Sequence, residues 1–346
     1  MHKKNPRYKE WQKRRLAKIA RRKSKKNPKK TSARASMQNK RSSPAKLSEI
    51  RTSMAKAPSN FCIRENYAET VKFFSSLLNY MHSCDECTNI LVDLSSVEQI
   101  SVDAIIYLLA IIKDKQKLSK TKHNFIGYLP ENEECRQFFI QSGFLNYVNS
   151  RCKKVDTPSN MIQIETSNVY DQTFTQKICD FVCQKSNYTI KNTKFLYVLI
   201  NEMMLNTIQH AYLDGTTNGS WYLFVQCDTT IKFTFLDTGL GIPKTALKKW
   251  NEKLFNKSDS GIITSALNGE LRTQTGSKYR GKGLPKIKEC VDNNLLNNIN
   301  IISNKAICSI NYDHNNNCSV INSIDLQHSL PGTIYYWELN LEGAKL

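Results

Sequence analysis

The positive charge of this chain is concentrated at its N-terminal end. The chain has 346 residues and a formal net charge of +20. Residues 1–58 contain 21 lysines and arginines but only two acids, Glu10 and Glu49, whereas the rest of the chain is almost neutral. A segment this polar and self-repelling cannot bury a core. We therefore expect a disordered basic tail over residues 1–58, with the folded part of the chain beyond it.

The basic tail has two interpretations. Its lysines and arginines can bind a polyanion by displacing counterions from phosphates, which is independent of sequence, and residues 7–26 could become helical on such a partner. The tail would then tether the protein to nucleic acid or a ribosome. It is equally well explained as a solubilising or leader segment without a partner, because charge with only two aromatics, Tyr8 and Trp11, identifies no ligand.

Composition excludes several classes of protein. No run of about 18 apolar residues occurs, so we expect no membrane-spanning helix. The N-terminal end is charged rather than apolar, unlike a signal peptide, which favours a cytoplasmic location. The 11 cysteines are then expected to be reduced thiols. Cys84 and Cys87 have the CxxC spacing of a zinc or redox site, but no second CxxC accompanies them, which favours ordinary thiols.

Strand and helix patterns alternate over residues 59–155, the first expected domain. Residues 89–94 (NILVDL) and 123–128 have the apolar, β-rich composition of buried strands. Residues 102–118 and 131–141 have apolar side chains at helical spacing. This alternation predicts an α/β domain with a mostly parallel sheet and helices packed on it.

The second expected domain, residues 160–346, has a different order of elements. A polar segment, 243–280, separates its two halves. We expect helices at 171–186, 190–212 and 283–292, and strands at 221–227, 231–237, 299–303, 306–312 and 333–341. This order predicts an α+β two-layer sandwich, with the helices on one face of a largely antiparallel sheet.

One helix of this second domain, 190–212, carries a polar row. Glu202, Asn206 and His210 are spaced by four residues and therefore lie along one face. Such a row is usually the solvated side of an amphipathic helix. Asparagine is a poor helix former, however, and its place in the interior of the helix weakens this interpretation, although the row alone does not establish a function. A carboxylate one turn from a carboxamide can hold a metal-bound phosphate and orient a water molecule beside it.

The strand predicted at 231–237 ends in a DxGxG motif, formed by Asp237, Gly239 and Gly241. A carboxylate at a strand end can accept a hydrogen bond from an adenine amino group. Glycine permits a close approach of the backbone to a ring. A glycine-rich turn capped by aspartate is the alternative, and it is common in sheet proteins.

A third motif, YRGKGLPKIKECV, precedes the helix predicted at 283–292. Gly281 and Gly283 flank Lys282 there, and backbone N–H groups at a helix N-terminus form an anion site. Lys282 and Arg280 add charges suited to phosphates. The motif matches neither a dinucleotide fingerprint nor a Walker A loop. A fourth short element, Gly332–Thr333, begins the last strand.

These four motifs, in this order, resemble the ATP-binding family that includes DNA gyrase, Hsp90, sensor histidine kinases and MutL (the GHKL family). The resemblance covers nearly all of residues 160–346. It implies a Bergerat-type ATP-binding fold with ATP and Mg²⁺ as ligands. In it, Asn206 would ligate the magnesium, Glu202 would be the general base, and Asp237 would bind adenine.

The resemblance also implies which residues complete the nucleotide site. Part of this set would line the adenine pocket, and the remainder would close over the phosphates as a mobile lid. These residues are Gly239, Gly241, Ile242, Arg280, Gly281, Lys282, Gly283, Leu284 and Thr333.

Two further details narrow the resemblance. The sequence NTIQHAY is similar to the anti-sigma-factor serine-kinase branch, where Asn-x-x-x-His-Ala is usual, and it makes His210 structural rather than catalytic. The sequence GELRTQT at 269–275 looks like the phosphoacceptor box of histidine kinases. It carries Gly269 where the histidine must be, which argues against a two-component histidine kinase.

The stretch ILVDLSSVEQISVDAIIYLL, together with GYLPENEECRQFFIQSGFLNYV, resembles the STAS domain of anti-sigma-factor antagonists. That family has an Asp-Ser pair at the start of a helix, and the serine is phosphorylated. The aligned residues here are Ser101 and Val102, so the usual phosphoacceptor is missing. Ser101 is better explained as a helix N-cap, and the first domain as a docking or sensing module.

The sequence therefore predicts an ATP- and magnesium-binding regulatory protein, in which a GHKL-type ATPase or serine/threonine protein kinase domain is fused to a STAS-like module. That module predicts a protein partner, and a homodimer is compatible with this interpretation. The same residues can support hydrolysis or phosphoryl transfer. One alternative is a binding protein tethered to nucleic acid, with ATP as a structural ligand and no catalysis. Another is an inactive nucleotide fold.

Overall fold

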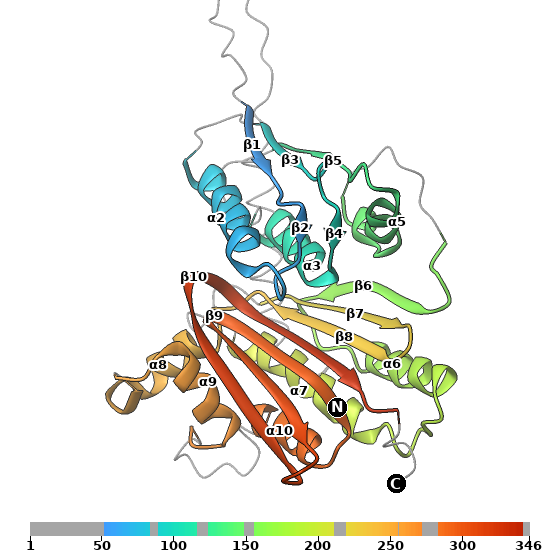
Figure 1. Ribbon diagram of the computed structural model, residues 1–346, viewed down its shortest axis with the longest axis vertical. Coiled ribbons are helices and arrows are strands. Elements are labelled where there is room, and N and C mark those ends of the chain that lie inside the picture. The colour runs from blue at the N-terminus through green and yellow to red at the C-terminus, as the bar shows by residue number, and fades with distance from the viewer. Residues whose placement is uncertain are drawn as a thin grey trace, which may run out of the picture. The chain divides into compact units, whose positions relative to one another are not determined.

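The computed structural model describes residues 52–83, 89–115, 124–148, 156–210, 219–254, 256–271 and 283–341. The chain divides into two compact units, residues 1–49 and 50–346, and all of the described residues belong to the second (Figure 1). Most of the expected basic tail, the Cys84–Cys87 pair, and residues Arg280, Gly281 and Lys282 lie outside the described residues. In the part of the chain that is described, no helix is long and apolar enough to span a membrane.

The first part of this unit contains a three-stranded parallel sheet in the order β1-β3-β5. Its strands are β1 (Thr52–Lys56), β3 (Asn89–Asp93) and β5 (Asn124–Tyr128). The two strands predicted in this region are therefore confirmed. The first strand was missed: β1 lies within the 1–58 range expected to be a disordered tail. Its sequence, TSMAK, is short and weakly apolar, and only Ala55 is buried.

In the described residues of this part, three helices accompany the sheet: α2 (Tyr67–Ser83), α3 (Val102–Ala110) and α5 (Glu133–Gln141). The sequence predicted α3 and α5 but not α2. A short π-helix, η1 (Ile111–Lys115), continues α3, and a single 3₁₀ turn, η2 (Phe144–Asn146), follows α5. A two-stranded parallel pair joins β2 (Asn60–Phe61) to β4 (Gln99–Ile100).

The second part contains a five-stranded sheet in the order β6-β7-β8-β10-β9, antiparallel at every pairing. Its strands are β6 (Met161–Ser167), β7 (Trp221–Cys227), β8 (Ile231–Asp237), β9 (Leu296–Asp313) and β10 (Cys318–Leu339). The predictions for β7 and β8 are confirmed to the residue. The predicted strands 299–303 and 306–312 are one continuous strand, β9, and 333–341 is only the end of β10.

Five helices belong to this second part: α6 (Gln172–Lys185), α7 (Lys194–His210), α8 (Ile242–Leu254), α9 (Asp259–Leu267) and α10 (Gly283–Asp292). The helices α6, α7 and α10 were predicted. The segment 243–280 was described from the sequence only as polar, with no helix predicted in it, whereas α8 and α9 occupy much of it. The Ser258 hydroxyl caps α9 by accepting a hydrogen bond from the Gly261 N–H at 3.2 Å.

Most of the five-stranded sheet is buried on both faces, although β10 is largely exposed over residues 318–329. One face packs against α6, α7 and α10 through side chains such as Leu223, Phe233 and Trp337. The other packs against the helices of the first part through Tyr222, Phe224 and neighbouring apolar residues. The two-layer arrangement expected for residues 160–346 is thus present, and the first α/β part adds a further layer on the opposite face of the sheet (Figure 1).

Candidate functional site

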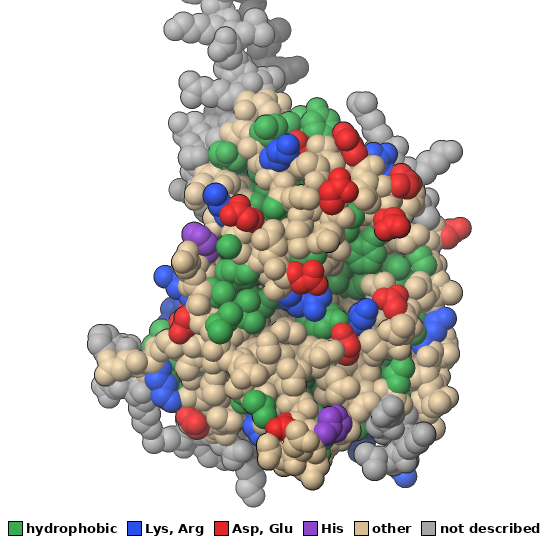
Figure 2. All heavy atoms as spheres, in the orientation of Figure 1, with side chains coloured by type: hydrophobic (Ala, Val, Ile, Leu, Met, Phe, Trp, Pro, Cys, Tyr) green, Lys and Arg blue, Asp and Glu red, His purple; other side chains and the backbone are tan. Residues whose placement is uncertain are grey.

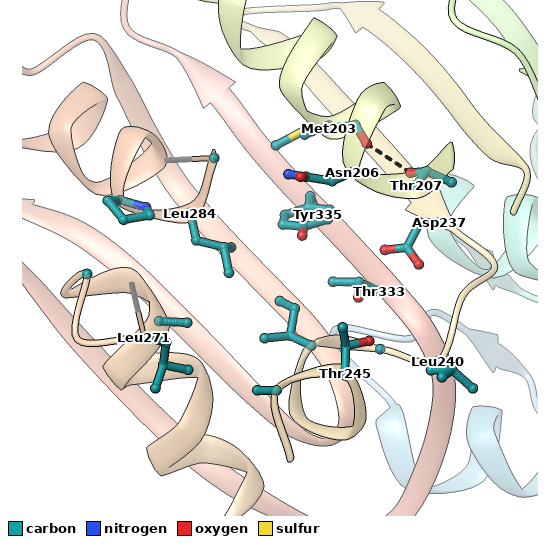
Figure 3. Close-up of a pocket in the computed structure, with 17 residues that line it drawn as sticks. Met203, Asn206, Thr207, Asp237, Leu240, Thr245, Leu271, Leu284, Thr333 and Tyr335 are labelled. Atoms are coloured by element: carbon teal, nitrogen blue, oxygen red, sulfur yellow. Dashed lines mark hydrogen bonds between the residues drawn. The ribbon is translucent and has the colours of Figure 1, made fainter. Parts of the chain in front are cut away.

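A cavity of about 180 Å³ lies beside the ends of β8 and β10 and the helices α7 to α10. Its wall is mostly apolar, with a few polar groups that point inward (Figure 3). The residues that line it are Met203, Asn206, Thr207, Asp237, Leu240, Gly241, Ile242, Thr245, Ala246, Ala266, Gly269, Leu271, Gly283, Leu284, Pro285, Thr333 and Tyr335. Seven of the residues selected from the sequence therefore meet in one cavity: Asn206, Asp237, Gly241, Ile242, Gly283, Leu284 and Thr333.

Asp237 is the carboxylate of this cavity. It is the last residue of β8 and is paired in register with Thr333 on β10. One of its oxygens accepts a hydrogen bond from the Gly239 N–H at 2.9 Å, and the Thr333 hydroxyl donates another. Enclosure by the surrounding protein nevertheless dominates and raises the pKa of Asp237 to about 6. The carboxylate is thus poised to accept a further donor from a ligand.

Tyr335 lies two residues beyond Thr333 on β10, on the cavity side of the sheet. Burial, and then the negative charge of Asp237, raise the pKa of its phenol far above the ordinary value. Thr333 is itself buried, and its hydroxyl lies 3.1 Å from the Ser303 hydroxyl of β9. The polar end of the cavity is therefore held by neighbouring strands rather than by loops alone.

The loop after β8 forms another wall. Gly241 has φ of +91°, a conformation that glycine adopts without strain. A Cβ atom there would meet the Asn304 side chain at about 2.5 Å. The next residue, Ile242, begins α8 and donates its N–H to the Ser303 hydroxyl at 2.9 Å. The second glycine of the DxGxG motif is thus required by the path of the chain.

Asn206 and Glu202 lie one turn apart on α7, close to the start of α10. A Cβ atom on Gly283 would lie 2.7 Å from Asn206 Nδ2 and 4.0 Å from Glu202 Cβ. Asn206 lines the cavity and is exposed. Glu202 is half-buried and borders the site without lining it. The N-terminus of α10 therefore lies close to the polar row of α7.

Among the predicted nucleotide-site residues that the structure describes, Glu202 and Gly239 do not line the cavity. Gly239 acts indirectly, because its N–H holds the Asp237 carboxylate. Arg280, Gly281 and Lys282 lie outside the described residues, so the predicted phosphate charges have no described position. His210 ends α7. The described part of the chain also contains no cluster of three or more His, Cys, Asp or Glu side chains that could hold a metal ion.

Most of the apolar residues that line the cavity were not predicted from the sequence. Met203 and Thr207 directly follow the predicted residues Glu202 and Asn206 on α7, and helical geometry could have indicated them. Ala266 and Leu271 come from the polar segment 243–280, in which no helix was predicted. Recognising the Ser258 N-cap, followed by the apolar run GIITSAL, would have predicted α9 and therefore this wall.

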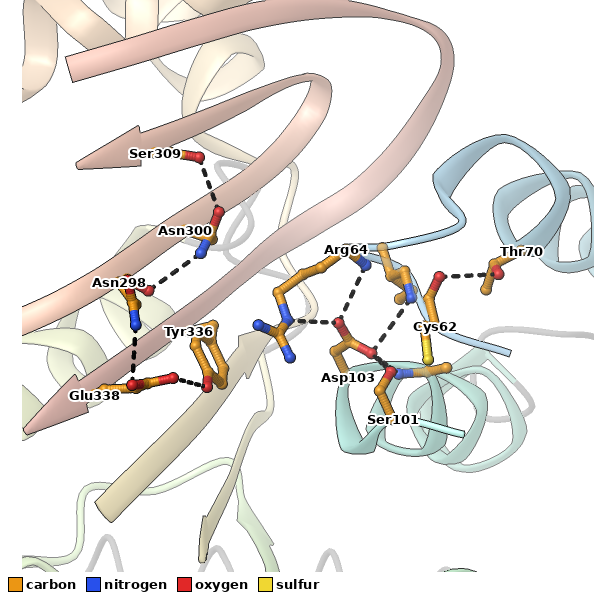
Figure 4. Close-up of polar contacts among 12 residues, drawn as sticks. Cys62, Arg64, Thr70, Ser101, Asp103, Asn298, Asn300, Ser309, Tyr336 and Glu338 are labelled. Atoms are coloured by element: carbon orange, nitrogen blue, oxygen red, sulfur yellow. Dashed lines mark hydrogen bonds and ion pairs between the residues drawn. The ribbon is translucent and has the colours of Figure 1, made fainter. Parts of the chain in front are cut away.

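A polar cluster also lies where the first part of the unit meets the five-stranded sheet (Figure 4). Ser101 occupies the N-cap position of α3, but its hydroxyl makes no capping bond and instead donates to the Asp103 carboxylate. The buried Asp103 also accepts from the N–H and the Nε of Arg64, both at 3.3 Å. The Arg64 guanidinium lies 3.6 Å from the centroid of the Tyr336 ring. The cluster thus joins α3 to β10.

Comparison of the chain with protein-family models, with curated proteins and with solved structures found no match.

Proposed function

We propose that the cavity binds the adenine base of ATP, with magnesium on its phosphates. One observation carries this proposal: Asp237, Asn206, Gly283 and Thr333 come from separate motifs and line one cavity. Each was selected for a role at a nucleotide, and their common location supports that combined role. The proposed family is the GHKL type, and the proposed companion domain is STAS-like.

The size and lining of the cavity fit a planar base. An apolar cavity of about 150 Å³ in another protein accommodates benzene, and this one is slightly larger, about 180 Å³. Leu240, Ile242 and Leu284 supply apolar surface. Asp237 supplies an acceptor at one end, which suits the exocyclic amino group of adenine. Guanine presents a carbonyl at the corresponding position, so the site should prefer adenine.

The phosphates would extend from the cavity toward Asn206 and the start of α10. Backbone N–H groups at a helix N-terminus bind anions. Magnesium is commonly held in proteins by one or two side chains together with substrate phosphates and water, and Asn206 would provide the side-chain oxygen. Glu202, one turn away and outside the cavity wall, would orient the attacking water or hydroxyl group. The segment 243–282, which includes α8 and α9, would cover the nucleotide.

Isothermal titration of the full-length protein with ATP, ADP and GTP, each with and without magnesium, tests the proposal. We expect magnesium-dependent binding of the adenine nucleotides and much weaker binding of GTP. Asn206→Ala should weaken the magnesium-dependent part of the affinity. Absence of any adenine-nucleotide binding would remove this function and favour an inactive nucleotide fold.

The reaction catalysed, if ATP is turned over, is either hydrolysis or transfer to a serine or threonine of a protein partner. Incubation with γ-labelled ATP separates these, because one releases labelled phosphate and the other labels protein. Glu202→Ala should abolish turnover and preserve binding. Turnover at the wild-type rate in this variant would disprove the role of Glu202 as the base.

A second candidate function follows from the charge of the tail. Basic and acidic side chains are interspersed on the face of the protein shown in Figure 2, whereas residues 1–58 carry nearly all the excess positive charge. We therefore propose nucleic-acid tethering by the tail, with ATP as a structural ligand. RNA titrated against the full-length protein and a variant that lacks residues 1–49 but retains β1, at two salt concentrations, tests this, and equal binding by both would exclude it.

A further inference from the structure

Two tyrosines of the first α/β part reach the strands behind the nucleotide cavity. Tyr67 of α2 donates its hydroxyl proton to the His328 carbonyl at 2.8 Å, and the same hydroxyl lies 3.5 Å from the Asn304 carbonyl. Tyr107 of α3 donates to the Pro331 carbonyl at 3.1 Å. Both helices thus hold the backbone of β9 and β10 at one place.

The strand residues at this place form hydrogen bonds with the loop after β8, which lines the cavity. Asn304 is fully buried, and its amide donates to the Leu240 carbonyl at 2.9 Å and accepts from the Lys244 N–H at 3.3 Å. The neighbouring Ser303 hydroxyl accepts from the Ile242 N–H at 2.9 Å and lies 3.0 Å from the Gly332 carbonyl. Two adjacent residues of β9 therefore fix the loop and first turn of α8, which line the cavity.

The strands are irregular at this point. The β9–β10 register shifts on both sides of Leu330, and Asn304 has φ of +52°. A bulge of this kind interrupts the ladder of backbone hydrogen bonds and leaves local conformation less determined by strand pairing. The tyrosine hydroxyls hold the segments on either side of the bulge. Its conformation therefore depends on contacts made by α2 and α3.

We propose that the Ser303–Asn304 step is a positioning element through which the packing of α2 and α3 sets the affinity of the cavity for adenine nucleotide. This inference rests on the proposed function and adds regulation to it. Displacement of α2 or α3 by a partner of the first part would release Asn304, loosen the loop at Gly241 and disassemble one wall of the cavity. Reciprocally, a bound nucleotide would stabilise the contacts of Tyr67 and Tyr107.

Three conservative variants test the proposal in the full-length protein. Tyr67→Phe and Tyr107→Phe each remove one hydroxyl and preserve the ring. Tyr147→Phe is the matched control, because its hydroxyl also joins the first part to the five-stranded sheet, by donating to the Ile164 carbonyl of β6 at 3.0 Å. Tyr147 and Ile164 do not line the nucleotide cavity.

The first measurement needs no ligand. Hydrogen exchange followed by mass spectrometry reports the protection of a peptide covering residues 240–246. We expect faster exchange there in Tyr67→Phe and Tyr107→Phe, and wild-type exchange in Tyr147→Phe. Unchanged exchange in both test variants, or equal acceleration in the control, would overturn the proposal.

The second measurement is the Kd for ATP with magnesium. Loss of one net hydrogen bond corresponds to a change of about three- to tenfold, so we expect weakening of this size in the two test variants and none in the control. Asn304→Gly, which retains access to positive φ but removes the amide, should weaken binding at least as much. Unchanged affinity in all variants would refute the proposed control of affinity.

The two measurements also separate this proposal from the function on which it rests. If the wild-type protein binds no adenine nucleotide, the proposed function fails, and with it the regulation of affinity. The exchange data then still determine whether the tyrosines hold the 240–246 loop.

Discussion

At the scale of single residues, Asp237 is a carboxylate that the fold holds at an energetic cost. Its donors, the Gly239 N–H and the Thr333 hydroxyl, are neutral groups, and enclosure raises its pKa to about 6. The folded protein therefore binds this proton more tightly than the unfolded chain, whose aspartate titrates near pH 4. A group retained at such a cost is a good candidate for ligand recognition.

This raised pKa predicts a specific pH dependence. The stability associated with Asp237 is complete below about pH 4 and is lost as the pH rises through about 6, where the folded-state carboxyl ionises. Asp237→Asn should therefore increase the free energy of unfolding at pH 8 by about 2 kcal/mol. It should also reduce the decline of the free energy of unfolding between pH 4 and 6. Urea unfolding at several pH values measures both effects.

The same variant should bind ATP more weakly, because a carboxamide is a poorer acceptor than a carboxylate for the adenine amino group. Higher stability together with weaker binding would distinguish a ligand-recognition role from general damage to the fold. Identical pH profiles for the variant and the wild-type protein would contradict the raised pKa.

Gly283 provides a second test at this scale. Gly283→Ala would place a methyl group about 2.7 Å from Asn206 Nδ2, so the Asn206 amide must move. We expect at least a tenfold loss of magnesium-dependent ATP affinity with little change in unfolding midpoint. Gly261→Ala in α9 is the matched control, since its nearest neighbour would be at 3.5 Å, an ordinary contact. Equal affinities in the two variants would exclude Asn206 from the site.

The polar residues of the candidate site were predictable because their chemistry and spacing are visible in sequence. Asn206 was conspicuous as an asparagine inside an apolar helix, and Asp237 as an acid at the end of an apolar strand. The apolar lining was not predictable in this way. Leucines such as Leu240 and Leu271 look the same in sequence whether they line a cavity or fill a core.

At the scale of elements, the helices and strands with regular apolar patterns were predicted best. The strands β7 and β8 and the helices α6 and α10 have uniform patterns that tertiary contacts do not override. By contrast, β9 was split in two at Asn304, because a polar residue with positive φ interrupts a strand that nevertheless continues. The helix α8 was missed because several lysines interrupt its apolar positions, and α9 was missed because the Ser258 N-cap before its apolar run was overlooked.

Asp325 is one of the residues that join helix α9 to the β9–β10 hairpin, and Asp259 of α9 is another, since it accepts from the Lys305 N–H at 2.9 Å. Asp325 accepts from the Ser260 N–H and from the Ser260 hydroxyl, both at 3.0 Å. Partial burial opposes its ionisation, but these hydrogen bonds and that of Ser258 outweigh it and lower the pKa of Asp325. Its contribution to stability is therefore present near neutral pH and is lost as the pH falls below about 4.

Asp325→Ala should destabilise the protein by about 1 kcal/mol near neutral pH and increase hydrogen exchange in α9. The difference from wild type should shrink in acid. Asp313→Ala is the control, because that carboxylate accepts only from its own hairpin turn, from the Asn315 N–H and the Asn316 amide. If both variants leave exchange in α9 unchanged, Asp325 does not fasten the helix.

At the scale of the whole molecule, the main difference between prediction and structure is the three-layered arrangement around the five-stranded sheet. The sequence contained the signal for it. The strand β7, WYLFVQC, has consecutive apolar residues instead of the alternation expected of a sheet with one solvated face. Which element covers the second face was not predictable, since local patterns do not specify a partner distant in sequence.

The shared sheet predicts the behaviour of a fragment. Residues 156–346 alone should expose Tyr222, Phe224 and the apolar residues around them, which the first part of the unit covers. We expect this fragment to bind the dye ANS and to self-associate, whereas the full-length protein does neither to a comparable extent. A monomeric fragment that does not bind ANS would show that the two parts fold independently.

Consecutive residues of the strand β10 face opposite sides of this sheet and take part in different contacts. Tyr335 lines the candidate cavity, and the Tyr336 ring lies against the Arg64 guanidinium on the opposite side of the sheet. Inserting a single residue between Thr333 and Tyr335 would reverse the orientation of every later side chain in the strand. Both the cavity and the contact with the first α/β part would then be lost. The spacing of residues 333–336 is therefore constrained by contacts on both faces of the sheet.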